Sequence, residues 1–156
     1  MGIANSAPKI VFVVNVAWYF RLHWLERALA AKAAGFLVYV VSGSDSVAGD
    51  CKFFETQGIH WMHWRVSRFS VAPSILHQEF QALKAILDDV YPDIVHSITI
   101  KPNLLCGIYS LQQKPDCRYV QTFPGMGSIL AGKSLKGVAK RVIATLALRR
   151  VCRNVD

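Results

Sequence analysis

Short apolar runs alternate with longer amphipathic stretches along this 156-residue chain. The runs are rich in Val and Ile and lack the strict alternation of apolar and polar residues that marks a half-exposed strand. They therefore predict strands covered on both faces, as in a parallel sheet. In the third run, Trp61 and Trp64 are expected on opposite faces of the sheet. We expect five strands, at residues 9–15, 36–42, 59–66, 94–97 and 118–123.

The stretches between the strands carry apolar residues at helical spacing. The first stretch predicts a helix that ends at Gly35. Its buried face is expected to consist of four apolar residues, Leu22, Leu25, Leu29 and Ala33. Further helices are expected at residues 50–57, 74–90, 102–112 and 136–151, with a turn at 125–127. Strands that alternate with helices through short turns predict an α/β fold, a Rossmann-like three-layer domain with a mostly parallel sheet.

The size and composition fit one domain with a substantial core, since 53% of the residues are hydrophobic. The longest apolar runs, at residues 10–14 and 36–41, fall well short of the roughly eighteen residues that a membrane-spanning helix requires. Residues 1–8 lack the basic and apolar regions of a secretory signal. We therefore expect an N-terminal tail at 1–8, one domain at 9–156 and a cytoplasmic location.

The net charge of +8 is concentrated near the end of the chain, where the last expected helix is amphipathic. One interpretation is a helix packed on the sheet with a basic outer face. The other is a peripheral contact with an anionic membrane surface, where each basic residue contributes roughly 1 kcal/mol. Nucleic acid is a third possible partner for this basic segment, but no nucleic-acid-binding motif supports it. The candidate membrane-facing residues are Lys133, Lys136, Lys140 and Arg141.

The cysteines are scattered without a C-x-x-C pair, which favours reduced thiols in a cytoplasmic chain. They are Cys51, Cys106, Cys117 and Cys152. A zinc set of Cys51 with His60 and His63 is conceivable, but the two histidines fit alternation along a strand better, so no metal site is expected. The dinucleotide pattern G-x-G-x-x-G and the nucleophile pattern G-x-S-x-G are both absent.

The candidate chemistry lies where strands are expected to end, because open α/β sheets bind ligands beyond the carboxyl ends of their strands. The fourth strand delivers His96, Thr99 and Lys101 to that edge. His96 suits a hydrogen bond to a hydroxyl or phosphate, or alternatively a structural bond to a loop carbonyl. Lys101 suits an anion at a helix start, or simple solvation. After the first strand, His23 and the aromatic residues before it shape either an acceptor pocket or only the cap of the sheet.

Four segments together resemble the amino-terminal domain of family 4 glycosyltransferases of the GT-B fold, in the subgroup that builds bacterial surface polysaccharides and lipid-linked oligosaccharides. The resemblance spans residues 9–156 and departs from the family pattern at Trp24, where a basic residue is usual. The segments are Asn15…Trp18-Tyr-Phe…His23, Ala34-Gly35-Phe-Leu-Val-Tyr-Val, Pro92-Asp-Ile-Val-His96…Thr99-Ile-Lys101-Pro-Asn and Gly125-Met-Gly127.

The resemblance implies the acceptor lobe of a metal-independent hexosyltransferase that uses a nucleotide sugar, UDP-linked by preference. The acceptor would be lipid-linked or a polysaccharide, at the inner face of the cytoplasmic membrane. The donor site and the catalytic glutamates would belong to a second Rossmann-like domain, so the chain is expected to be half of a bilobal enzyme and inactive alone. The cleft residues implied are Asn15, His23, His96, Thr99, Lys101, Gly125 and Gly127.

Two other interpretations of the sequence stay open. The chain could be a non-catalytic subunit that recruits a separate catalytic partner to the membrane and completes its cleft. It could also be an unrelated α/β nucleotide-binding domain, in which case it would bind UDP tightly without a second lobe.

Overall fold

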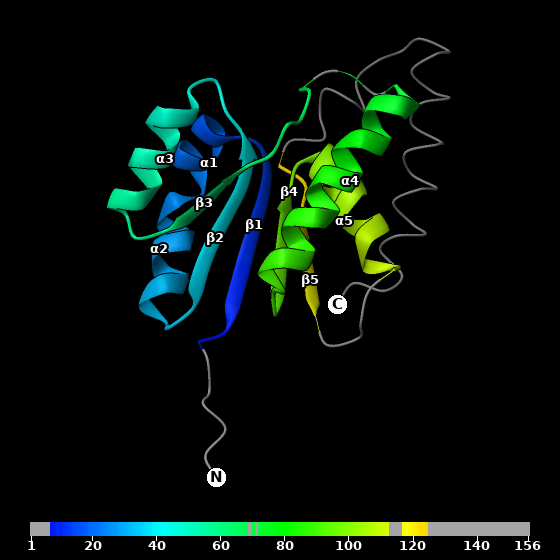
Figure 1. The fold of residues 1–156 in the computed structure, drawn as a ribbon. Coiled ribbons are helices and arrows are strands. Elements are labelled where there is room, and N and C mark those ends of the chain that lie inside the picture. Colours follow the sequence, from blue (N-terminus) through cyan, green and yellow to red (C-terminus); the bar gives the residue numbers. More distant parts are fainter. Residues whose placement is uncertain (1–6, 69, 71, 113–116, 125–156) are drawn as a thin grey trace.

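The computed structural model describes residues 7–68, 70, 72–112 and 117–124 (Figure 1). Their strands form one sheet in which every neighbouring pair is parallel, in the order β3-β2-β1-β4-β5. The expected turn at 125–127 and helix at 136–151 lie outside these residues. The strands are β1 (Lys9–Val16), β2 (Leu37–Gly43), β3 (His60–His63), β4 (Ile94–Ile98) and β5 (Arg118–Thr122).

Helices cover both faces of the sheet, which gives three layers (Figure 1). On one face lie α1 (Ala17–His23), α2 (Leu25–Ala33) and α3 (Val47–Thr56), and on the other lie α4 (Pro73–Val90) and α5 (Ile100–Ser110). The chain builds outward from β1 to β3 along one half of the sheet, then crosses over to β4 and continues to β5. The predicted α/β Rossmann-like fold is confirmed, and β1 and β4 flank the point where the strand order reverses.

The absence of polar alternation in β1 follows from burial on both sides. Val11 and Val13 belong to the core beneath α4 and α5, whereas Phe12 and Val14 belong to the core beneath the other helices. All four side chains are at most 2% exposed. Each inner strand therefore contributes side chains to the apolar core on both faces of the sheet, which explains the continuous apolar runs in the sequence.

Trp61 and Trp64 lie on opposite faces of the sheet, as expected, although β3 ends at His63 and is shorter than the predicted strand. Trp61 packs against the core that contains Phe12, and Trp64 is fully buried in the core that contains Val11. The Trp64 indole donates a hydrogen bond to the Glu79 carbonyl at 3.0 Å, so the segment after β3 is fixed to α4.

The prediction of one helix after the first strand was wrong. The helical path breaks at Trp24, whose backbone adopts φ −128° and ψ −10°, and this break separates α1 from α2. The buried residues of α1, the break and α2 are Ala17, Phe20, Trp24 and Ala28. Leu25 and Leu29 of the predicted face pack against this core and are partly buried. Leu22, expected on that face, is 70% exposed. In α1 the aromatic Phe20 takes the position next to the sheet, and Leu22 is turned to solvent.

Candidate functional site

The site begins at the carboxyl ends of β1 and β4, where connections leave the sheet in opposite directions. Such a point forms a crevice that binds ligands in open α/β sheets. Val13 of β1 pairs with Ser97 of β4. Two residues further along each strand, Asn15 and Thr99 therefore stand at the same level on either side of the crevice. The sequence correctly selected both positions as lying at this edge.

Asn15 occupies an irregularity at the end of β1. The register of β1 against β2 shifts between Val14 and Val16, so Asn15 is the extra residue. Its side-chain oxygen Oδ1 is buried and has no hydrogen-bond partner. The neighbouring strand approaches closely, because a Cβ on Gly43 would lie 2.7 Å from the Asn15 carbonyl oxygen. A bulge at a strand end re-aims a side chain, and the residue in this one carries a buried acceptor without a partner.

Thr99 has the most strained backbone in this region. Its φ of 76° and ψ of 167° fall in a region that is essentially restricted to glycine, at a cost of about 1–3 kcal/mol. The conformation is held from both sides, because the Thr99 amide donates to the Thr122 carbonyl at 3.1 Å and the Thr99 carbonyl accepts from the Asn103 amide at 3.0 Å. Its hydroxyl oxygen is buried and unpartnered. Strain of this kind clusters at functional sites, where the surrounding structure imposes it.

Asn103 was missed by sequence reasoning, although it lies in the first turn of α5, four residues after Thr99. The side chain is fully buried, and its amide nitrogen donates to the Thr122 carbonyl at 2.9 Å. Its oxygen Oδ1 has no partner. Asn15, Thr99 and Asn103 thus each bury an oxygen that can accept a hydrogen bond. Because buried polar groups are nearly always paired in folded proteins, these oxygens suit a ligand that donates hydrogen bonds, such as a sugar hydroxyl.

His96 lies in the middle of β4, not at its end as the sequence suggested. The ring packs between Phe12 and Trp24, with centroid distances of 5.3 and 5.2 Å. Its Nε2 lies 2.9 Å from the Thr122 hydroxyl. Burial, and secondarily the positive charge of Arg27, lower the pKa of His96 to about 4. The imidazole is therefore neutral near pH 7, and it supports Thr122, whose carbonyl holds Thr99 in place.

Lys101 lies at the start of α5, but its ammonium is directed into the domain. It donates to the carbonyls of Ser67 at 2.6 Å and Ser70 at 2.7 Å, and it pairs with the Glu79 carboxylate at 3.0 Å. The side chains of Lys101 and Glu79 are only 9% and 4% exposed. An ammonium has three donors, and all three are occupied. The expected role of Lys101 as an anion ligand is corrected to a structural one, which fixes the segment after β3.

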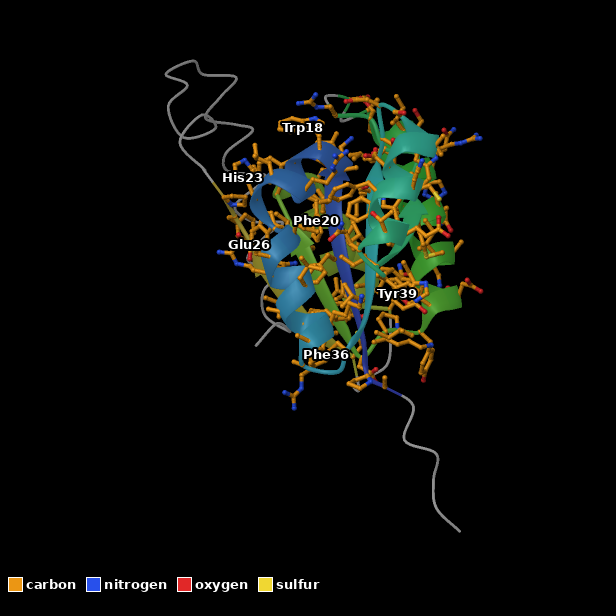
Figure 2. The ribbon with its side chains drawn as sticks, turned by 90° about the vertical axis from the view of Figure 1, so that its left-hand side faces the viewer. Trp18, Phe20, His23, Glu26, Phe36 and Tyr39 are labelled. Carbon is orange, nitrogen blue, oxygen red and sulfur yellow. The ribbon has the colours of Figure 1, made fainter. Side chains whose placement is uncertain are left out.

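His23 is exposed near the end of α1, and Figure 2 shows it on the same helix as Trp18. Its ring packs against that of Tyr19, tilted by 50°, with a centroid distance of 4.6 Å. The structure gives His23 no contact with Asn15, Thr99 or His96 among the described residues. The other expected cleft residues, Gly125 and Gly127, lie outside the described part of the chain, as do Lys133, Lys136, Lys140 and Arg141.

A cavity of about 560 Å³ opens beside the crevice, at the carboxyl ends of β2 and β3. Gly43 lines it and also abuts Asn15, so the cavity and the crevice adjoin. Ser44, His63 and Gln78 contribute polar atoms to its wall. Across the described ranges, no three His, Cys, Asp or Glu side chains gather closely enough to hold a metal ion.

Residues 127–134 carry a signal that sequence reasoning missed. The stretch Gly-Ser-Ile-Leu-Ala-Gly-Lys-Ser matches the spacing G-x-x-x-x-G-K-[ST] of phosphate-binding loops. The pattern requires a strand before it and a helix after it, and β5 ends only five residues before Gly127. The segment lies outside the described residues, so the match is one of spacing in the sequence.

The family model described as "Glycosyl transferase 4-like" matches residues 9–153. The chain belongs to the glycosyltransferase 4-like family. Among curated protein sequences, none matches the chain. In the part of this glycosyltransferase-like domain that the structure describes, no helix has the length and apolarity to cross a bilayer.

Two of the solved structures that resemble this chain show the same fold at low identity. One is a glycosyltransferase from Rickettsia africae, with a TM-score of 0.54 and 18% identity over 75% of this chain and 30% of the other. The second is a sucrose-phosphate synthase from Thermosynechococcus elongatus, with a TM-score of 0.57 and 13% identity over 90% of this chain and 40% of the other. The family 4-like domain thus spans well under half of either structure, and its sheet and helices correspond to one lobe of the GT-B fold.

Proposed function

We propose that this chain is the acceptor-side lobe of a hexosyltransferase. In this proposal, a hexose or N-acetylhexosamine moves from a nucleotide sugar, UDP-linked by preference, to a lipid-linked or polysaccharide acceptor. The observation that carries it is the set of buried, unpartnered oxygens on Asn15, Thr99 and Asn103. Membership of the glycosyltransferase 4-like family supports a sugar as the ligand that would supply the missing hydrogen-bond donors.

The chemistry of the site favours the acceptor over the donor diphosphate. A diphosphate offers only acceptor oxygens and requires cations, N–H groups or hydroxyls. The amide oxygens of Asn15 and Asn103 can only accept, and the Thr99 hydroxyl can accept as well as donate. Lys101 is engaged with Glu79 and two carbonyls, and His96 is uncharged near pH 7. The acceptor hydroxyls would be oriented by Asn15, Thr99 and Asn103, and the reaction would be accelerated mainly by positioning. The donor would be held chiefly by groups outside the described residues, and Gly125 and Gly127 would face the donor phosphates or the acceptor sugar across the cleft.

We further propose that transfer requires no metal ion and occurs at the inner face of the cytoplasmic membrane. Neutralisation of the leaving diphosphate would then fall to protein groups in a second lobe or in a partner subunit. Lys133, Lys136, Lys140 and Arg141 would contact anionic lipid by charge. Chelation with EDTA should accordingly leave transfer unchanged.

The test is transfer of radiolabelled sugar from UDP-glucose and UDP-N-acetylglucosamine in membranes of the source cells. Membranes from a deletion strain should lose one labelled glycolipid or polysaccharide product, and the restored wild-type gene should return it. Restoration with Thr99→Val should reduce the product at least tenfold, since the methyl group replaces the hydroxyl. Unchanged product after deletion would contradict the proposal. Binding of ATP and Mg²⁺ that depends on Lys133, without sugar transfer, would instead favour a nucleotide-binding domain.

A further inference from the structure

Helix α1 presents two large apolar side chains to solvent, one helical turn apart. Trp18 is 44% exposed and Leu22 is 70% exposed. Together with Arg21 and with Phe53 of α3 they line a shallow groove of about 490 Å³. We refer to Trp18, Arg21, Leu22 and Phe53 as the α1 patch. Figure 2 shows Trp18 at the end of the molecule where β1 leads into α1.

The exposed Trp18 and Leu22 are not the residues that attach α1 to the sheet. The same short helix buries Ala17 and Phe20 against the sheet, at 1% and 0% exposure. Trp18 and Leu22 therefore belong to the opposite side of α1, and none of the described core clusters includes them. Burial of large apolar side chains is the main favourable contribution to association, and Trp18 and Leu22 are available for such burial. An exposed apolar surface of this kind marks a site of contact with a partner or a membrane.

Two arginines border the α1 patch. The Arg21 guanidinium lies 3.9 Å from the Phe53 ring centroid, and the Arg68 guanidinium lies 5.6 Å from that of Trp18. The first turn of α1 contains no acidic residue, and its last turn contains Arg21 and His23. The acid that contacts the patch, Asp50, is buried and bound to Arg21 at 3.4 Å and also to the Ser44 hydroxyl. Tryptophan with arginine, beside an exposed leucine, is the composition of surfaces that lie in the boundary between water and lipid.

We propose that the α1 patch docks on a lipid bilayer that carries anionic head groups. Trp18 and Leu22 enter the head-group layer, while Arg21 and Arg68 remain at the level of the phosphates. Trp18 follows Asn15 by three residues, so docking brings the crevice between β1 and β4 next to the lipid surface. The role of this docking in catalysis rests on the proposed lipid-linked acceptor. The docking itself does not depend on enzyme activity.

The experiment measures partitioning of the 156-residue chain onto two kinds of vesicle. One is phosphatidylcholine alone, and the other contains about 30% phosphatidylglycerol, which supplies anionic head groups. The wild type is expected to bind the anionic vesicles. The variant Trp18→Ala/Leu22→Ser is expected to lower the partition coefficient at least tenfold. The matched control is Tyr91→Asn/Leu111→Ser, which removes two exposed apolar side chains, 63% and 49% exposed, from the other end of the sheet. It is expected to change partitioning less than twofold.

A second readout locates the contact. Brominated lipid should quench part of the tryptophan fluorescence of the wild type, and Trp18→Phe should abolish that quenching while it preserves most of the binding. Circular dichroism of each variant checks that the fold is retained.

Several results would overturn the inference. One is the absence of binding to anionic vesicles. Another is binding that salt abolishes but the patch variant leaves unchanged, since charge elsewhere would then carry it. A patch variant that changes the oligomeric state in light scattering, with no effect on vesicles, would assign the patch to a second copy of the chain. Loss of the proposed sugar transfer would leave the vesicle result intact, so the two failures are distinguishable.

Discussion

The ammonium of Lys101 lies 3.0 Å from the carboxylate of Glu79, and the two residues form a buried ion pair between α5 and α4. Glu79 also accepts a hydrogen bond from the Ser67 amide at 2.6 Å. The pair therefore binds two helices and the segment after β3 into one unit. This segment borders both the cavity and the crevice, so the ion pair acts on the site by holding its wall.

Lys101→Ala should strongly destabilise the domain, because it leaves the Glu79 carboxylate buried without its counter-charge. The expected loss is about 3–5 kcal/mol in the free energy of unfolding, measured by urea denaturation. The double variant Lys101→Met/Glu79→Leu should recover a large part of that loss, since it removes both charges. Destabilisation of less than about 1 kcal/mol by Lys101→Ala would show that the ammonium is free for a ligand after all.

Thr99→Gly should separate stability from function. Glycine adopts φ 76° and ψ 167° without strain, so the variant is expected to be as stable as the wild type or up to about 1–2 kcal/mol more stable. The same change removes the hydroxyl from the crevice, and sugar transfer should fall at least tenfold. Thermal unfolding and the membrane transfer assay report the two effects separately. Full activity with raised stability would remove Thr99 from the site.

Gly43→Ala should disturb the junction between the crevice and the cavity. The added Cβ would meet the Asn15 carbonyl at 2.7 Å and the Val66 side chain at 3.0 Å, and backbone cannot move as cheaply as a flexible side chain. We expect a loss of about 1–3 kcal/mol in unfolding free energy together with reduced transfer. Gly49→Ala in α3 is the matched control, because its Cβ would meet the Ser46 side chain, with the hydroxyl at 3.0 Å, and no backbone atom. If both variants behaved alike, the close approach at Gly43 would not be the cause.

The lowered pKa of His96 should make the stability of the folded domain depend on pH. Its pKa is about 4 in the folded domain, against about 6.5 when unfolded, so between these values the unfolded chain binds more protons. The contribution is fully present above pH 6.5 and is lost as the pH falls toward 4. Since the ring is only partly buried, we expect a loss on the order of 1 kcal/mol or more. His96→Gln should lack this contribution, which urea unfolding of both proteins at pH 7, 5.5 and 4.5 would measure. Parallel pH profiles for the two proteins would contradict the prediction.

The sequence by itself determined the order and the kind of the described elements, except that it predicted one helix where α1 and α2 are separated at Trp24. Continuous Val and Ile runs such as residues 10–14 cannot be buried on one face only, so they specified a sheet covered on both sides. The stripe of Phe80, Leu83 and Leu87 specified α4 in the same local way, and these residues are buried as expected. The position of Thr99 at a strand end followed from the short strand before it. Each of these features depends on side chains within one or two turns of the chain.

The tertiary structure decided which side chains meet. Nothing local to Lys101 indicates that Glu79, 22 residues earlier, neutralises it, so a lysine at a helix start resembled a ligand-binding residue. The periodic leucines likewise predicted a buried Leu22, whereas competition with Phe20 and Trp24 for the surface of the sheet turned it outward. Asn103 became part of the site only because Thr122, on another strand, orients its amide. Hydrogen bonds and packing between distant segments are decided by the whole fold, which is why a local pattern placed the edge of the site but not its contacts.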